Sequence, residues 1–183
     1  MKNIKIVLFI IFLIMVVYSF PFPVFGDSQL DLSIGIGVPE FIKVGIRYNI
    51  GQLQFGLNYG FLPIENETCT SINGDIYFHF AGSSKYTVRK PWYSRFGLSF
   101  VKHKQEQKTS SYVYSNFRVG REFWVSKRVG IGLDVGISLE LYKEIKEEQE
   151  NTGWFDFDWE CPILPCISVN IFYHFDFFTN NKG

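Results

Sequence analysis

The chain has 183 residues with 18 basic and 18 acidic side chains, so its formal net charge is zero. That balance argues against a nucleic-acid-binding protein, which needs a basic excess to contact phosphates. Aromatic residues make up 19% of the chain and glycine contributes 16 residues, whereas methionine contributes only 2. Because aromatic enrichment favours strands, the composition predicts an all-β protein.

Residues 1–26 have the pattern of an N-terminal signal peptide. Two lysines precede an unbroken run of apolar and weakly polar residues over 6–20, and small side chains near Gly26 fit a cleavage site. An uncleaved membrane anchor is the alternative, although two prolines end the apolar run before the roughly 20 residues that a helical span requires. We expect cleavage after Gly26, which makes residues 27–183 the mature domain.

From residue 30 onward, apolar residues recur at every second position, which is the period of a β-strand. The clearest case starts at Val129, where Ile131, Leu133 and Val135 alternate with glycines and with Asp134. Strands of about ten residues have the length that crosses a bilayer at a tilt. The pattern predicts eight of them, at residues 30–38, 42–49, 53–61, 71–80, 91–100, 112–123, 129–141 and 167–177.

Glycine indicates which face of these strands points inward. Ten of the 16 glycines lie on the polar faces, at positions 35, 37, 45, 56, 60, 97, 120, 130, 132 and 136. Small residues suit the cramped interior of an eight-stranded barrel, while the opposite faces are bulky and apolar, as a lipid-facing wall is. The sequence therefore predicts an eight-stranded antiparallel up-and-down transmembrane β-barrel, with a soluble exported β-domain as the alternative.

Aromatic residues gather near the predicted strand ends, where the interfacial girdles of membrane barrels lie. The group comprises Tyr59, Phe61, Phe80, Trp92, Phe123, Trp124, Tyr142, Tyr173 and Phe177.

Together with the alternating strands, the glycine-rich polar face and the phenylalanine-rich segment 171–178, this pattern resembles the small bacterial outer-membrane barrels of the OmpA/OmpX type. The resemblance covers nearly all of 27–183 and implies an outer-membrane location. Family members usually end on the aromatic residue that the assembly machinery reads, whereas residues 179–183 follow it here.

With both termini in the periplasm, the external connections are a short turn at Pro39 and loops at 62–70, 102–111 and 142–165. The last loop combines acidic residues with Trp154, Phe155, Phe157 and Trp159. It is interpreted first as a solvated loop or an extension of the two flanking strands. The second interpretation is an exposed patch that binds a partner or lipid headgroups.

Charged residues on the polar faces predict an ion-pair network that fills the lumen, because enclosed charges persist when they are paired. A narrow ion path is the alternative, but eight strands rarely leave room for water. The predicted lumen charges are Asp31, Lys43, Arg47, Asp75, Arg95, Arg118, Asp134 and Glu140.

Three cysteines, Cys69, Cys161 and Cys166, fall in predicted external loops or at strand tips. An oxidising compartment favours a disulfide, and pairing of Cys161 with Cys166 is the simplest arrangement. Pairing of Cys69 with either one is the alternative.

No residue pattern indicates catalysis, because none of the three histidines has a nucleophile at a suitable spacing. Metal binding is the weaker interpretation of the cysteines, because no histidine lies near them in the sequence, and we expect no cofactor. We expect a monomeric outer-membrane barrel, surrounded by outer-membrane lipid, that presents its external loops to an extracellular ligand or host surface for adhesion or recognition. The alternatives are a narrow pore or lipid-associated transport barrel and, third, a lipid A-modifying enzyme.

Overall fold

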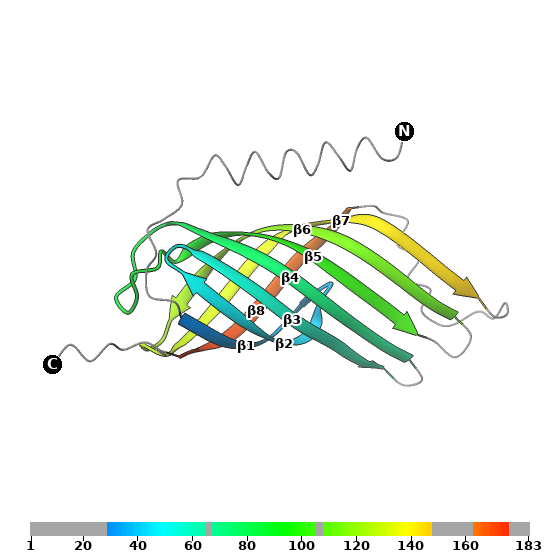
Figure 1. Cartoon of the computed structure of the whole chain (residues 1–183), viewed down its shortest axis with the longest axis horizontal. Coiled ribbons are helices and arrows are strands. Elements are labelled where there is room, and N and C mark those ends of the chain that lie inside the picture. The colour runs from blue at the N-terminus through cyan, green and yellow to red at the C-terminus, as the bar shows by residue number, and fades with distance from the viewer. Residues whose placement is uncertain (1–28, 65–66, 105–107, 148–162, 176–183) are drawn as a thin grey trace.

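The computed structural model describes residues 29–64, 67–104, 108–147 and 163–175 (Figure 1). They form eight strands, each antiparallel to the next, and β8 pairs with β1 to close a barrel. The strands are β1 (Gln29–Val38), β2 (Phe41–Ile50), β3 (Leu53–Ile64), β4 (Glu67–Ala81), β5 (Trp92–Lys104), β6 (Lys108–Trp124), β7 (Val129–Glu147) and β8 (Ile163–Phe175). The predicted fold class is confirmed, while the predicted signal peptide at 1–26 lies outside the described residues.

The two faces of the wall differ in the way that the glycine pattern predicts. On β7, the apolar side chains of Leu133, Val135 and Ile137 are 43%, 62% and 46% exposed, whereas Gly132 and Asp134 between them are buried. Apolar residues therefore cover the outside and polar residues fill the inside. This arrangement suits hydrocarbon around the barrel, because closure leaves no unpaired strand edge along the spanning part of the wall.

None of the described residues belongs to a helix of the length and apolar character needed to cross a bilayer.

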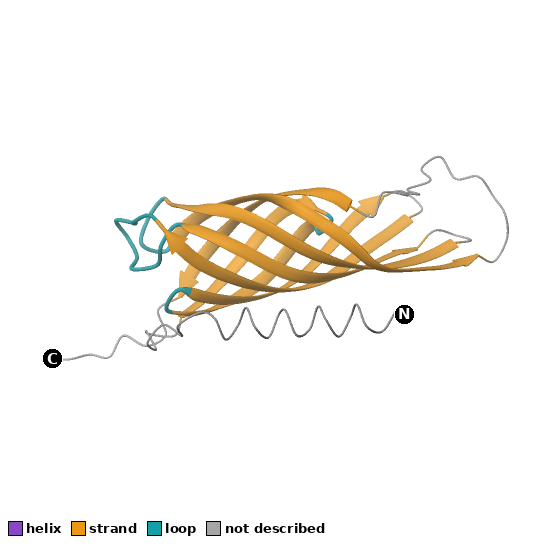
Figure 2. Cartoon of the chain, turned by 90° about the horizontal axis from the view of Figure 1, so that it is seen from above, coloured by secondary structure: helices purple, strands orange, loops and turns teal. Residues whose placement is uncertain are grey.

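The barrel has two unlike ends (Figure 2). At one end, called the turn end, residues 51–52, 82–91 and 125–128 connect the strands. At the other end, called the extended end, the strands stop at different heights. Strands β1 and β2 have 10 residues each, whereas β6 has 17 and β7 has 19.

The predicted external loops at 62–70, 102–111 and 142–165 are largely strand, which corrects the sequence-based boundaries. Above a bilayer both faces of a strand meet water, so pairing continues after the apolar alternation stops. Only residues 65–66, 105–107 and 148–162 of these segments remain outside the described strands.

The short turn between β1 and β2 lies inside the barrel, although the sequence predicts an external turn at Pro39. Both Pro39 and Glu40 are buried, and the hydroxyl of Ser71 on β4 donates a hydrogen bond of 3.2 Å to the Glu40 carbonyl. The next residue, Phe41, has a φ of 61°. Because β1 and β2 are short, the turn folds inward between walls that continue past it.

Candidate functional site

The middle of the lumen holds six buried charged residues, here called the central charge cluster: Glu40, Lys43, Asp75, Arg95, Arg118 and Asp134. Glu40 contacts three cations at once. Its carboxylate oxygens lie 3.2 Å from Nζ of Lys43, 2.5 Å from Nη2 of Arg95 and 2.8 Å from Nη2 of Arg118. Arg118 also donates from Nη1 to Oε2 of Glu40 at 3.0 Å, so that pair is bidentate. The carboxylate therefore ties the β1–β2 turn to β2, β5 and β6.

Two further carboxylates complete the central charge cluster. Asp75 on β4 accepts from Nε and Nη2 of Arg95, each at 2.9 Å. Asp134 on β7 lies 3.4 Å from Nη1 of Arg95 and 3.2 Å from Nη1 of Arg118. Asp134 also accepts a hydrogen bond of 2.7 Å from the Ser168 hydroxyl. Every carboxylate of the cluster thus has a guanidinium or ammonium partner, which a buried charge requires.

Aromatic rings separate this cluster from the turn end. The Arg47 guanidinium carbon lies 5.5 Å from the ring centroid of Tyr77 and 5.0 Å from that of Phe172. Tyr77 in turn meets Tyr93 edge to face at 5.4 Å. Trp124, expected in the outer girdle, instead packs against Phe172 inside the barrel at 5.1 Å between centroids. Its position two residues beyond Glu122 continues the inward phase of β6.

A second set, the turn-end charge cluster, comprises Asp31, Arg47, Arg89, Glu122 and His174. Arg89 enters the lumen from the 82–91 loop and is only 4% exposed. Its Nη2 lies 3.3 Å from Oδ2 of Asp31 and 3.0 Å from Oε2 of Glu122. Arg47 lies 3.6 Å from Glu122, and His174 Nδ1 lies 2.5 Å from Asp31. A residue of the loop therefore completes the ion pairs of this cluster.

The two clusters balance in charge. Five cations (Lys43, Arg47, Arg89, Arg95 and Arg118) face five carboxylates (Asp31, Glu40, Asp75, Glu122 and Asp134), and each of the ten is at most 4% exposed. Side chains of opposite sign thus fill the described lumen, and solvent has almost no access to them. The described part of the lumen is therefore lined by paired charges, with no excess of either sign among these ten residues.

Seven of the eight lumen charges named from the sequence lie in these clusters. Glu140 does not, because it lies half-buried toward the extended end, and no ion pair joins it to another described residue. Four members were missed, among them His174, which shares the inward face of β8 with the buried residues Ser168 and Asn170. Glu122 follows the period-2 phase of Arg118 and could have been read from it, whereas Glu40 and Arg89 lie in connections whose inward course carries no sequence signal.

An apolar cluster lies in the lumen toward the extended end. Cys69, Val101, Tyr114 and Leu164 form a buried cluster, with Phe41, Leu62 and Tyr112 packed against it. Its members come from β2 to β6 and β8, so the cluster covers the central charges on this side.

Both described cysteines are free thiols inside the wall rather than at loop tips. Cys69 is 5% and Cys166 is 1% exposed, and the Cys166 thiol lies 3.9 Å from Oδ1 of Asn116. Cys161 lies outside the described residues, so its pairing with Cys166 stays a prediction. The predicted binding patch of Trp154, Phe155, Phe157 and Trp159 also lies outside them.

Each histidine has a partner of its own. Besides the contact of His174 with Asp31, Nδ1 of His79 lies 2.7 Å from the Lys90 carbonyl and Nε2 of His103 lies 2.9 Å from Glu67. In each of these three contacts the partner of the histidine is a carboxylate or a backbone carbonyl, and neither is the hydroxyl or thiol of a nucleophile.

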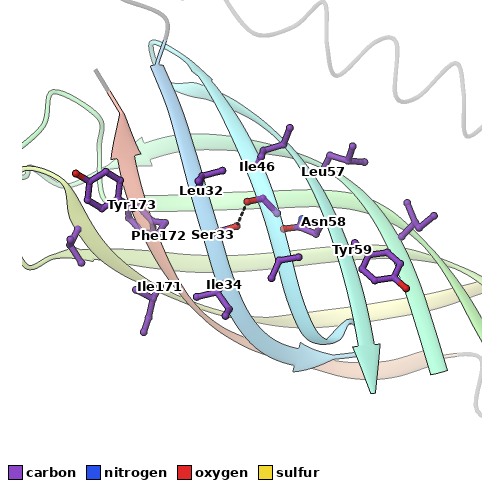
Figure 3. Close-up of a pocket in the computed structure, with 14 residues that line it drawn as sticks. Leu32, Ser33, Ile34, Ile46, Leu57, Asn58, Tyr59, Ile171, Phe172 and Tyr173 are labelled. Carbon is purple, nitrogen blue, oxygen red and sulfur yellow. Dashed lines mark hydrogen bonds between the residues drawn. The ribbon is translucent and has the colours of Figure 1, made fainter. Parts of the chain in front are cut away.

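A hollow of about 770 Å³ lies on the outer wall, across β8, β1, β2, β3 and β4 (Figure 3). Its lining includes the outward residues Leu32, Ile34 and Ile46, which are 46%, 56% and 46% exposed. Behind it the Ser33 hydroxyl donates to the Gly45 carbonyl at 3.3 Å. The lining is almost wholly apolar and belongs to the outward face of the wall.

No protein-family model matches this sequence, and no curated protein matches it. Among solved structures, the chain is similar to the N-terminal β-barrel domain of Pseudomonas aeruginosa OprF, with 10% identity and a TM-score of 0.51 over 82% of this chain and 99% of that one. It also matches Acinetobacter baumannii CarO (10% identity, TM-score 0.47, 80% and 97% covered) and Neisserial surface protein A (13%, 0.46, 82% and 96%).

The closed topology and the apolar exterior agree with the OprF match at the level of fold. An apolar wall of this kind requires a bilayer around it, which supports an outer-membrane location. The chain therefore has the fold of the eight-stranded bacterial outer-membrane β-barrels.

Proposed function

We propose that this protein is an outer-membrane barrel with a closed lumen that presents its extended end to the outside for adhesion or recognition. The observation that supports a non-conducting anchor is the charge-balanced lumen, in which Arg47, Arg95 and Arg118 are each at most 2% exposed. A conducting pore would need water beside these guanidinium groups.

Strand length supports the recognition role. A spanning β-strand needs about 9–11 residues, whereas β6 has 17 and β7 has 19. The surplus lies at the extended end, so β6 and β7 project beyond the bilayer there. In this orientation the turn end faces the periplasm, and the projecting strands carry the residues available to an extracellular ligand or host surface.

Orientation is tested in a background without native cysteines. Tyr142→Cys places a thiol at the extended end, where the native side chain is 54% exposed, and Val88→Cys places one at the turn end, where it is 94% exposed. A membrane-impermeant maleimide added to intact cells should label only Tyr142→Cys, and both should react after the envelope is permeabilised. Labelling of Val88→Cys alone in intact cells would show that the barrel has the opposite orientation, with the turn end outside.

Two further measurements test the role. The protein should show heat-modifiable migration in outer-membrane fractions and no conductance steps in planar bilayers. Cells that display the chain should adhere to an epithelial monolayer better than cells in which residues 148–162 are replaced by a Gly-Ser linker of equal length. Steady conductance would favour the pore, and equal adhesion would remove the recognition role from this segment.

A further inference from the structure

The turn end carries a basic arc that the closed lumen does not use. Its loop and turn are the teal segments at one end of the barrel in Figure 2. Five cations occupy exposed positions there and on the adjacent strand: Lys85, Lys90, Arg121, Lys127 and Arg128.

No exposed carboxylate offsets this charge within the described part of the chain. The two carboxylates at this end, Asp31 and Glu122, are 0% and 2% exposed, and both are paired with Arg89 inside the lumen. The described carboxylates with appreciable exposure, Glu67, Glu140 and Glu144, all lie toward the extended end. Among the residues that the structure describes, the exposed charges at the turn end are therefore all positive.

Arg121 is the most informative member of the arc because it lies on the lipid-facing wall. It is exposed on β6 and pairs in register with Trp92, the first residue of β5. Its guanidinium carbon lies 5.3 Å from the Trp92 ring centroid and 5.0 Å from that of Phe123. A lipid-facing cation is costly at the bilayer midplane and costs little near the surface, so Arg121 belongs at the level of the headgroups.

Two other cations of the arc also lie beside aromatic rings. Arg128 donates from Nη1 to the Tyr173 hydroxyl at 3.5 Å, and Nζ of Lys85 lies 5.9 Å from the Tyr86 ring centroid. Tyrosine and tryptophan rings gather at the membrane–water interface. These pairs therefore place the arc where lipid phosphates lie.

We propose that the basic arc binds the phosphate groups of anionic phospholipids in the periplasmic leaflet, with Arg121, held between Trp92 and Phe123, as the central contact. The inference rests on the proposed function, which turns this end toward the periplasm. A guanidinium group is suited to phosphate because its planar fork can donate two parallel hydrogen bonds. Each cation near an anionic membrane surface should strengthen binding by about fivefold.

Native mass spectrometry of the purified full chain tests the proposal. The protein is mixed in detergent with equal amounts of phosphatidylglycerol and phosphatidylcholine, and the lipids that stay bound are counted. The unchanged protein should retain phosphatidylglycerol preferentially. Arg121→Gln and the double variant Lys127→Gln/Arg128→Gln should each reduce that preference, by about fivefold for each charge removed, while Arg121→Lys should retain part of it.

The chain offers a matched control at the extended end. Lys102 and Lys104 are exposed on β5, so Lys102→Gln/Lys104→Gln removes the same net charge as the turn-end double variant. This control should leave the phosphatidylglycerol preference unchanged. An equal loss of phosphatidylglycerol preference in both double variants would mean that only the overall net charge matters. That result would overturn the proposed binding site at the turn end.

A further binding experiment uses lipid A, because this lipid carries its phosphates in the opposite leaflet. Lipid A binding that is abolished by the turn-end variants, without any phosphatidylglycerol preference, would overturn the periplasmic assignment. Heat-modifiable migration of every variant separates loss of the site from loss of the fold. Reversed maleimide labelling, by contrast, would contradict the proposed function itself.

Discussion

Glu40 belongs to the two-residue turn between β1 and β2, yet its Oε1 lies 2.5 Å from Nη2 of Arg95 on β5. The contact joins residues 55 positions apart in the sequence and is fully buried on both sides. Arg118 of β6 holds the same carboxylate in a bidentate pair. The turn is therefore a structural centre of the lumen, on which β2, β5 and β6 converge.

Replacement of Glu40 by glutamine should be strongly destabilising. Glu40→Gln keeps the shape but leaves Lys43, Arg95 and Arg118 short of one buried negative charge, and breaking a buried pair costs about 3–5 kcal/mol. The urea midpoint of the folded barrel in detergent micelles measures the change. Glu67→Gln is the control, because its pair with His103 is partly exposed and such pairs contribute about 0–1 kcal/mol. Similar midpoints for the two variants would contradict the central role of Glu40.

The neighbouring residues Arg89 and Lys90 should behave differently. Arg89→Ala removes the side chain that anchors the 82–91 loop to Asp31 and Glu122, so the loop should open. Chymotrypsin should then cleave faster after Tyr86, which is 39% exposed. Lys90→Ala keeps the hydrogen bond that the Lys90 N–H donates to the side-chain Oε1 of Gln52 and should leave the cleavage rate unchanged. Equal rates in both variants would mean that Arg89 does not hold the loop.

Three glycines give a graded test of packing in the wall. A Cβ added at Gly120 would meet Cζ of Tyr93 at 2.5 Å and the Leu133 carbonyl at 2.6 Å. The nearest atom to a Cβ at Gly132 is the Tyr93 hydroxyl at 3.5 Å, and nothing lies within 4 Å at Gly74. Gly120→Ala should therefore lower the heat-modification temperature, consistent with the roughly 1–3 kcal/mol typical of overpacking. Gly132→Ala and Gly74→Ala should change it little, and a reversed order would contradict the packing.

Arginine on the outside of β7 should reveal where the bilayer lies. Val135 is 62% exposed near the middle of the expected span, so Val135→Arg should destabilise the barrel in lipid vesicles by about 2–4 kcal/mol. Tyr142, 54% exposed on the same strand, lies beyond the span. Tyr142→Arg should cost about 0–1 kcal/mol at most. Equal unfolding free energies would place both residues at the same depth.

The thiols should be shielded rather than bridged. Because Cys69 and Cys166 are 5% and 1% exposed, a bulky maleimide should react slowly with both while the barrel is folded. After denaturation without reductant, mass spectrometry should count three alkylated cysteines. A count of one would instead indicate a disulfide, such as the Cys161–Cys166 pair predicted from the sequence.

The wall of the barrel could be predicted from the sequence because its cause is local. Side chains of a strand alternate between two faces, so the succession of Leu133, Asp134 and Val135 already states which residue meets lipid and which meets the lumen. The glycine positions indicate which face points inward, because a narrow lumen has little room for large side chains. Strand ends were harder to predict at the extended end, where β6 and β7 continue into water without an apolar face.

The pairing of the charged side chains in the lumen was decided by closure of the barrel. Which lumen charges meet depends on strand register and on β8 pairing with β1, neither of which a single strand carries. Glu40 and Arg89 lie in connections next to Pro39 and Pro91, where a polar residue is normally read as solvent-exposed. They turn inward because the closed lumen holds Arg95 and Arg118 at one level and Asp31 and Glu122 at another. Buried charges need partners of opposite sign, and only the tertiary structure brings those partners together.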